Sequence, residues 1–293
     1  MCRLPAHEID DLKLSLSTRV AENFRDKREA TVELNDLAQI AAREGYYALC
    51  MRASQVGVDD NRERIRSARA TLESRDLTVS MVTGDFAIPE NSEQGPGALR
   101  NIEPYLDVAD DLGCDLLRIC MKTADDIQWA RDAADAAQER GLRLAHQCHT
   151  RSLFETVHET LEVLRSVGRS NFGLIYEPAN LELCGQPYAG ETLEALYPWI
   201  FNVYLQNQRV HAGGADELET WTRGPVRFDQ CPLWEEGGLD VTRIVDELDR
   251  QGYSGYITVH QASAGLGGAE EAARRSSGYL RDIGPFEDRR LPR

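Results

Sequence analysis

The sequence is poor in positive charge and lacks the apolar segments of membrane and exported proteins. Its 293 residues hold 33 Lys and Arg against 49 Asp and Glu, a formal net charge of −16. No basic stripe is present, so this charge opposes binding to a nucleic-acid backbone. No apolar run is long enough for a membrane span, and residues 1–11 lack the basic and apolar regions of a signal peptide. We therefore expect a cytoplasmic protein that binds neither nucleic acid nor membrane.

Several chemical motifs are also missing. The seven cysteines are scattered and form no CxxC pair, which excludes the usual zinc knuckle and argues against a disulfide framework. The sequence has no phosphate-cradling glycine loop, Ser-His-Asp motif or paired-carboxylate glycosidase signature. A glycine-rich segment, GLGG at 265–268, comes after the last apolar run, whereas a dinucleotide fold needs its glycines after an early strand.

The chain instead contains eight short apolar runs that alternate with stretches of helical periodicity. The predicted strands cover 12–18, 46–53, 78–84, 115–121, 142–148, 172–177, 200–206 and 256–261. The predicted helices cover 33–44, 61–75, 99–112, 124–140, 150–167 and 241–250, with a last helix after the glycine-rich segment. Glycines at 45, 113, 141 and 252 close four of these units, as expected of residues that accept the left-handed C-cap conformation.

This rhythm predicts an α/β fold, a (β/α)8 TIM barrel formed by residues 1–293 as a single domain. An open doubly wound sheet has the same alternation, but the early glycine motif it requires is absent. The polar stretch 207–238, after the seventh strand, is longer than the other connections and is expected to be a lid. Residues 284–293 are expected to form a solvated tail.

Polar side chains cluster where the later strands end. His146–His149, Glu177–Asn180, Gln206–Asn207 and His260–Gln261 are the four clusters. In a TIM barrel the C-terminal ends of the strands converge at one mouth, where active sites form. His149 and His260 are candidate proton-transfer residues. His146 alternates to the other side of its strand and is expected to contact neighbouring helices.

Three segments carry a family resemblance: HQCHT at 146–150, YEPANLELCG at 176–185, and PLWEEGGLDVTRIVDELDRQGYSGYITVH at 232–260. They resemble the xylose-isomerase-like sugar isomerase/epimerase superfamily, the last most specifically. The resemblance implies one divalent metal held by four side chains, which fall here on Gln147, Glu177, Gln206 and His260. Because this set has one carboxylate and one imidazole, it favours Mn²⁺ over Mg²⁺, with Co²⁺, Fe²⁺ and Zn²⁺ as alternatives.

The resemblance further implies a metal-assisted isomerase or epimerase that acts on a sugar or polyhydroxy carbonyl through an enediolate. An amide cannot take a proton, so Gln147 is excluded as the base and His260, His149 and Glu177 are the catalytic candidates. The first alternative is an eliminating lyase or dehydratase on a keto-sugar or glycoside, similar to C-glycoside-cleaving enzymes with a second subunit. The other is a non-catalytic sugar-binding subunit. The family habit implies a homo-oligomer.

Six further residues are predicted to contact the substrate: Arg52, Asn180, Asn207, Arg209, His211 and Trp234. For Asn180 and Asn207 an ordinary structural role is an equal alternative. Arg118 lies inside the fourth strand and is expected to be structural, because an unpaired guanidinium there would be costly. Lys122 follows that strand and is expected to be a surface residue. Tyr204 is assigned to the core.

Overall fold

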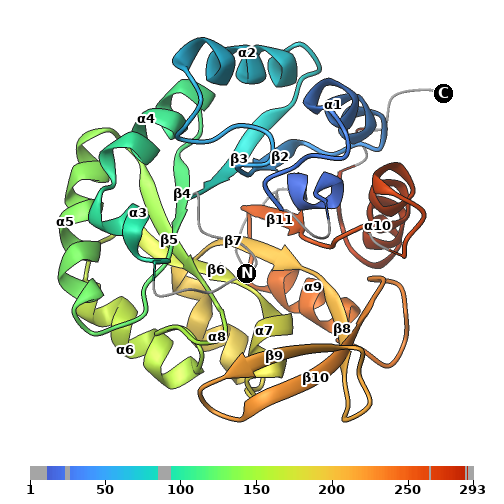
Figure 1. The fold of residues 1–293 in the computed structure, drawn as a ribbon. Helices are drawn as coiled ribbons and strands as arrows, with labels where there is room; N and C mark the ends of the chain where they lie inside the picture. The colour runs from blue at the N-terminus through green and yellow to red at the C-terminus, as the bar shows by residue number, and fades with distance from the viewer. Residues whose placement is uncertain (1–11, 24–26, 85–93, 264, 288, 290–293) are drawn as a thin grey trace, which may run out of the picture.

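The computed structural model describes residues 12–23, 27–84, 94–263, 265–287 and 289. Eight parallel strands close into a barrel in the order β1–β11–β7–β6–β5–β4–β3–β2, with the helices arranged around it (Figure 1). The strands are β1 Lys13–Ser17, β2 Ala48–Met51, β3 Thr78–Thr83, β4 Leu116–Ile119, β5 Arg143–Gln147, β6 Phe172–Tyr176, β7 Ile200–Leu205 and β11 Tyr256–Val259. All eight predicted strands are present, and the predicted (β/α)8 barrel is confirmed.

The helices follow the strands along the chain. They are α1 Leu34–Arg43, α2 Arg62–Glu73, α3 Gly97–Arg100, α4 Glu103–Leu112, α5 Asp126–Glu139, α6 Val157–Val167, α7 Pro178–Leu183, α8 Glu191–Leu196, α9 Val241–Arg250 and α10 Ala269–Ile283. Two short 3₁₀ helices, η1 Thr18–Ala21 and η2 Tyr197–Trp199, complete the set. None of the described helices is both long and apolar enough to cross a membrane.

Local sequence explains where these elements begin and end. The Asn61 side chain accepts a hydrogen bond from the Arg64 amide at 2.9 Å and so caps α2. Gly113 ends α4 in the left-handed conformation at φ 68°, which side-chain-bearing residues rarely adopt. In α9 the buried positions are Val241, Ile244, Val245 and Leu248, a spacing that puts one apolar face on the barrel.

The barrel interior contains paired polar side chains among its apolar ones. The Ser15 and Ser80 hydroxyls lie 2.7 Å apart, and Thr258 donates to Asn202 Oδ1 at 2.9 Å. The first pair joins β1 to β3 and the second joins the neighbouring strands β7 and β11, and all four residues are buried. Polar groups can therefore occupy the barrel because they are hydrogen bonded there.

Three predicted segments differ from the structure. The predicted helix 99–112 is two helices, because the chain leaves helical geometry at Asn101 and Pro104 stands in the first turn of α4. The predicted helix 150–167 begins only at Val157, where the Thr156 side chain caps it. Segment 207–238 contains an antiparallel sheet in the order β8–β10–β9, made of β8 Asn207–Val210, β9 Asp216–Thr220 and β10 Gly224–Cys231. Its role as a lid stays a prediction.

The predicted tail starts later than expected. The Leu12 amide donates to the Pro285 carbonyl at 3.0 Å, and Phe286 is buried beside that contact. Residues 284–287 therefore pack on the barrel next to β1. The rest of the predicted tail, at 288 and 290–293, lies outside the described residues.

We predict that Gly173→Ala in β6 destabilises the fold. A Cβ at this position would lie 2.6 Å from the Trp199 carbonyl oxygen and 2.7 Å from the Phe201 ring, so backbone or ring must move. Overpacking of this kind costs about 1–3 kcal/mol in the free energy of unfolding. Urea unfolding measures the loss, with Gly97→Ala as the control because a Cβ there meets nothing within 4 Å. Equal stability of the two variants would contradict the packing described for β6.

Candidate active site

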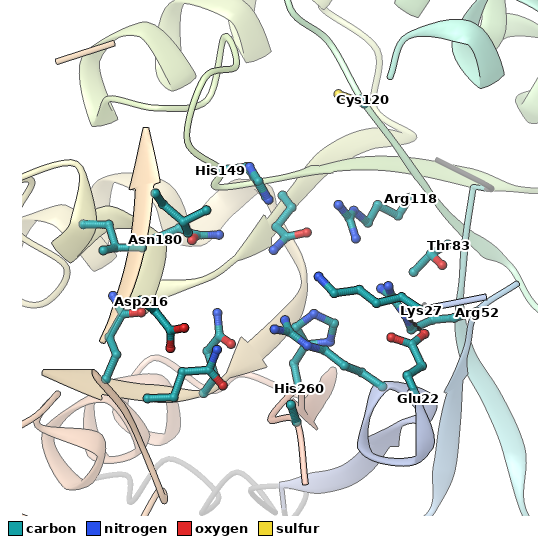
Figure 2. A pocket seen from close by; sticks show the side chains of 18 of the residues that line it. Glu22, Lys27, Arg52, Thr83, Arg118, Cys120, His149, Asn180, Asp216 and His260 are labelled. Carbon is teal, nitrogen blue, oxygen red and sulfur yellow. Dashed lines mark hydrogen bonds and ion pairs between the residues drawn. The ribbon is translucent and has the colours of Figure 1, made fainter. Parts of the chain in front are cut away.

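A pocket of about 280 Å³ opens at the C-terminal mouth of the barrel (Figure 2). Its walls come from the ends of several strands: Thr83 closes β3, Gln147 closes β5, and Gln206 and His260 follow β7 and β11. The antiparallel sheet contributes Asp216 and other residues of β8–β10 on one side. The strand ends identified in the sequence thus converge on one cavity.

Glu177 is the central buried group beneath this cavity. The side chains of Gln147, Asn180 and Gln206 all donate hydrogen bonds to its carboxylate, Gln206 at 2.5 Å and Asn180 at 2.8 Å. Burial raises the pKa of Glu177 to about 7, while the amide donors and the charges of Arg19 and Arg118 act in the opposite direction. The carboxyl group can therefore exchange a proton near neutral pH.

Glu177 influences the pocket indirectly, by holding these three amide side chains in place. Its side chain is fully buried, whereas Gln147, Asn180 and Gln206 line the cavity. Glu177 is also the N-cap residue of α7, but its side chain makes no capping hydrogen bond, so capping does not account for it. The structure indicates a positioning residue that holds three amide groups at the pocket floor.

His260 reaches the pocket as a neutral imidazole. Its ring stacks on Tyr204 at 3.8 Å between centroids, and its Nδ1 lies 3.0 Å from the Ser17 hydroxyl. The Tyr204 hydroxyl in turn contacts the Cys50 thiol at 3.2 Å. Burial, followed by repulsion from Arg19 and Arg52, holds the pKa of His260 well below its usual range. Tyr204 is fully buried, as predicted, and also fixes the orientation of the His260 ring.

His149 is the second imidazole of the pocket (Figure 2). Its Nδ1 lies 3.0 Å from the Thr150 carbonyl, and because a carbonyl only accepts, Nδ1 carries the hydrogen and Nε2 keeps the lone pair. Burial, then repulsion from Arg118, lowers the pKa of His149 to about 4. His146 faces away from this site, stacked on Phe154 at 4.0 Å, which agrees with the sequence alternation.

The four predicted metal ligands meet, but they do not make a cation site. Gln147 and Gln206 point amide hydrogens at the Glu177 carboxylate. Within the described part of the chain, no three His, Cys, Asp or Glu side chains cluster closely enough to hold a metal ion. Arg19, Arg52, Arg118 and Lys27 also surround His260 and would repel a divalent cation. One carboxylate, two amides and one imidazole beside four cations do not fit Mn²⁺ or a similar ion.

Two of the six predicted substrate contacts line the pocket. Arg52 does so while bound to Glu22, with 2.5 Å between Nε and Oε1. Asn180 donates to the Cys148 carbonyl and to Glu177, both at 2.8 Å, and faces the cavity next to these contacts. Asn180 therefore combines the structural and the site role that the sequence left open.

The other four predicted contacts lie outside the pocket. In β8, Gln208 lines the pocket, whereas Asn207 and Arg209 on either side of it do not. Asn207 bonds the backbone of Pro232, Glu235 and Leu239. Arg209 pairs with Glu235 at 2.8 Å, and His211 with Asp229 at 2.7 Å. Trp234 packs under the Arg275 guanidinium at 4.1 Å.

Several lining residues were not predicted from the sequence. Arg19 lies two residues beyond the end of β1, Lys27 lies further along the same connection, and Arg118 projects from β4, all into the pocket. Arg118 was predicted to be structural. Strand alternation in β4 could have placed Arg118 inside the barrel, but nothing in the sequence around Lys27 marks it.

The fold agrees with the comparisons to known proteins. The sequence profile of the xylose isomerase-like TIM barrel family matches residues 38–283, and the chain belongs to that family. No curated protein sequence matches it significantly.

Solved structures with the same fold differ in their named activities. The probable 3-DHS dehydratase AsbF of Bacillus anthracis is 14% identical, with a TM-score of 0.69 over 92% of this chain and 99% of its own. D-psicose 3-epimerase of Clostridium cellulolyticum is 12% identical, with a TM-score of 0.67 over 93% and 99%. A Mycobacterium smegmatis protein solved with magnesium is 14% identical, with a TM-score of 0.65 over 94% and 96%. At these identities the likeness shows the fold.

We predict a pH signature for Glu177. Its pKa is about 7 in the folded protein against an unfolded value near 4.5, so the folded state binds more protons between these values. The contribution of Glu177 to the free energy of unfolding therefore falls as pH rises through this window. Glu177→Gln removes this titration. The free energy of unfolding of the Glu177→Gln variant minus that of wild type should therefore rise by on the order of 3 kcal/mol between pH 4.5 and 8.

Denaturant unfolding across this pH range provides the measurement. The lowered pKa of His149 makes stability rise with pH between about 4 and 6.5, but this effect is common to both proteins and cancels in the difference. A difference that does not change with pH would show that the Glu177 carboxyl group titrates normally.

We also predict that no divalent metal is resident. Protein purified without added metal or chelator should contain Mn, Co, Fe and Zn far below one equivalent by plasma mass spectrometry, and Mn²⁺ should not raise its melting temperature. We expect this result because the four candidate ligands include only one carboxylate and lie beside four basic side chains. Near-stoichiometric metal that disappears in a Glu177→Ala/His260→Ala double variant would contradict it.

Proposed function

We propose that this protein is an enzyme that moves a proton next to the carbonyl of a small polyhydroxy substrate, in the manner of a sugar isomerase, without a metal. The observation that carries the proposal is the pairing of two neutral imidazoles, His149 and His260, with basic side chains in one pocket. A neutral imidazole accepts a proton from carbon, and nearby cations stabilise the negative charge that forms on oxygen.

The chemistry follows from the position of each group. His149 Nε2 would take the proton from the carbon beside the carbonyl, and the Arg118 guanidinium would stabilise the enediolate oxygen. The same imidazolium would then return its proton to the neighbouring carbon while the hydroxyl proton of the enediolate passes to the former carbonyl oxygen, which interconverts an aldose and a ketose. Epimerisation needs a second, protonated group on the opposite face. Because His260 is neutral at pH 7, it cannot be that group, and the one-base isomerisation is favoured over an epimerisation that uses His260 as the acid.

A second candidate is elimination, as in a dehydratase or other lyase. Burial and the charges of Arg19 and Arg52 lower the pKa of Lys27 to about 8, so this ammonium group in the pocket is a competent acid for a leaving hydroxyl at neutral pH. A probable dehydratase among the proteins of similar fold is consistent with this chemistry. An unsaturated product would select elimination, and an isomeric ketose or aldose would select isomerisation.

The remaining expectations stay proposals. A homo-oligomer, a second subunit in the glycoside-cleaving alternative, and a cytoplasmic location are not tested by the fold. The non-catalytic sugar-binding alternative is tested by the experiment that follows, because a binding subunit would not exchange substrate protons.

We predict that the wild-type protein exchanges carbon-bound hydrogen of its substrate with D₂O. A panel of ketoses, aldoses and keto-sugar acids is incubated with the protein, and deuterium next to the carbonyl is detected by NMR. His149→Gln should reduce the exchange rate about 10²- to 10⁴-fold, the usual contribution of a general base. His260→Gln should also reduce exchange, but less.

His158→Gln serves as the matched control, because the His158 side chain is 82% exposed on α6 and lies outside the pocket. It should exchange at the wild-type rate. Exchange that survives His149→Gln unchanged would rule out His149 as the base. Binding of a panel sugar without any exchange would favour the sugar-binding subunit.

A further inference from the structure

The pocket has a basic wall although the protein as a whole is strongly acidic. Arg19, Lys27, Arg52 and Arg118 all line it, while the whole chain has a net charge of −16. Figure 2 shows Lys27, Arg52 and Arg118 together on one side of the pocket, with Asp216 and Asn180 on the other. The positive charge is therefore concentrated by the fold, since it comes from separate segments of the chain.

Only part of this charge is neutralised within the described residues. Arg52 is bound to Glu22, which also accepts the Ser54 hydroxyl at 3.2 Å. Among the described residues, the Arg19 guanidinium and the Lys27 ammonium make no hydrogen bond or ion pair. Both side chains are only partly exposed, so water screens them less than it screens surface groups.

The other described acids near the pocket make no ion pair with Arg19 or Lys27. Glu177 lies beneath the pocket floor, where Gln147, Asn180 and Gln206 donate hydrogen bonds to its carboxylate. Asp216 and Glu217 belong to β9 on the far side of the pocket, and Glu217 pairs with Arg227 at 3.2 Å. Burial, followed by repulsion from Arg19 and Arg52, lowers the pKa of Lys27, which agrees with its position beside these cations.

We propose that Arg19, Lys27 and Arg118 bind an anionic group of the substrate, either a carboxylate or a phosphate, so that the enzyme acts on a sugar acid or a sugar phosphate rather than a neutral sugar. Guanidinium groups bind both anions with paired, charge-assisted hydrogen bonds. This inference rests on the proposed function in one respect, that the pocket is where the substrate binds. The sequence has no phosphate-cradling glycine loop, and this anion site consists of basic side chains from separate segments instead.

Calorimetric binding to the full-length protein tests it with three probes: D-fructose 6-phosphate, 5-keto-D-gluconate and neutral D-fructose. At least one of the two anions should bind ten times or more tighter than D-fructose, and high salt should weaken that binding. Arg19→Gln and Lys27→Gln should each weaken it about ten- to a hundredfold, as expected when a charge-assisted hydrogen bond is lost. Which anion binds separates phosphate from carboxylate.

Arg165→Gln provides the matched control, since it removes the same charge from an exposed position on α6 and should leave anion binding unchanged. The inference is overturned if D-fructose binds as tightly as both anions, if neither anion binds, or if the Arg19 and Lys27 variants both bind like wild type. Deuterium exchange is measured separately, so failure of the anion site and failure of the proposed catalysis give different results.

Discussion

The mouth of this barrel depends on one buried carboxylate. Glu177 accepts hydrogen bonds from Gln147 at the end of β5, Asn180 on α7 and Gln206 after β7. A buried carboxylate without such partners would be costly, so these three segments are tied to one another through it. The amides in turn form the floor of the pocket. Glu177 thus shapes the site by orienting its neighbours, and the groups that face the cavity are amides, imidazoles and basic side chains.

Sequence periodicity predicted the barrel because each strand is a short apolar run and each return helix has one apolar face. It could not predict the antiparallel sheet, since β9 reads DELET and its side chains are largely exposed, which leaves no alternation to detect. The sheet is instead fixed to the barrel by tertiary contacts, where Val226 and Phe228 of β10 pack on Leu183 of α7. Long-range packing of this kind has no local signature.

The candidate site was predictable where it lies at strand ends. Gln147, Gln206 and His260 follow directly from the rule that these ends meet at one mouth. The rule fails just beyond the ends. It predicts that Asn207 faces the pocket, whereas in β8 the next residue, Gln208, does so and the Asn207 side chain bonds backbone groups. The strand-end rule also does not predict Lys27, which reaches the pocket from an irregular segment after η1.

This chain differs from what the family resemblance implies in the source of positive charge at the pocket. A bound divalent cation would supply that charge in a metal-dependent relative, whereas basic side chains line this pocket and, after burial, lower the pKa values of both imidazoles. An anion bound to these side chains would offset their repulsion, so the pKa of His149 would rise on binding. The base would then strengthen only in the complex, which links recognition of the anionic group to proton transfer.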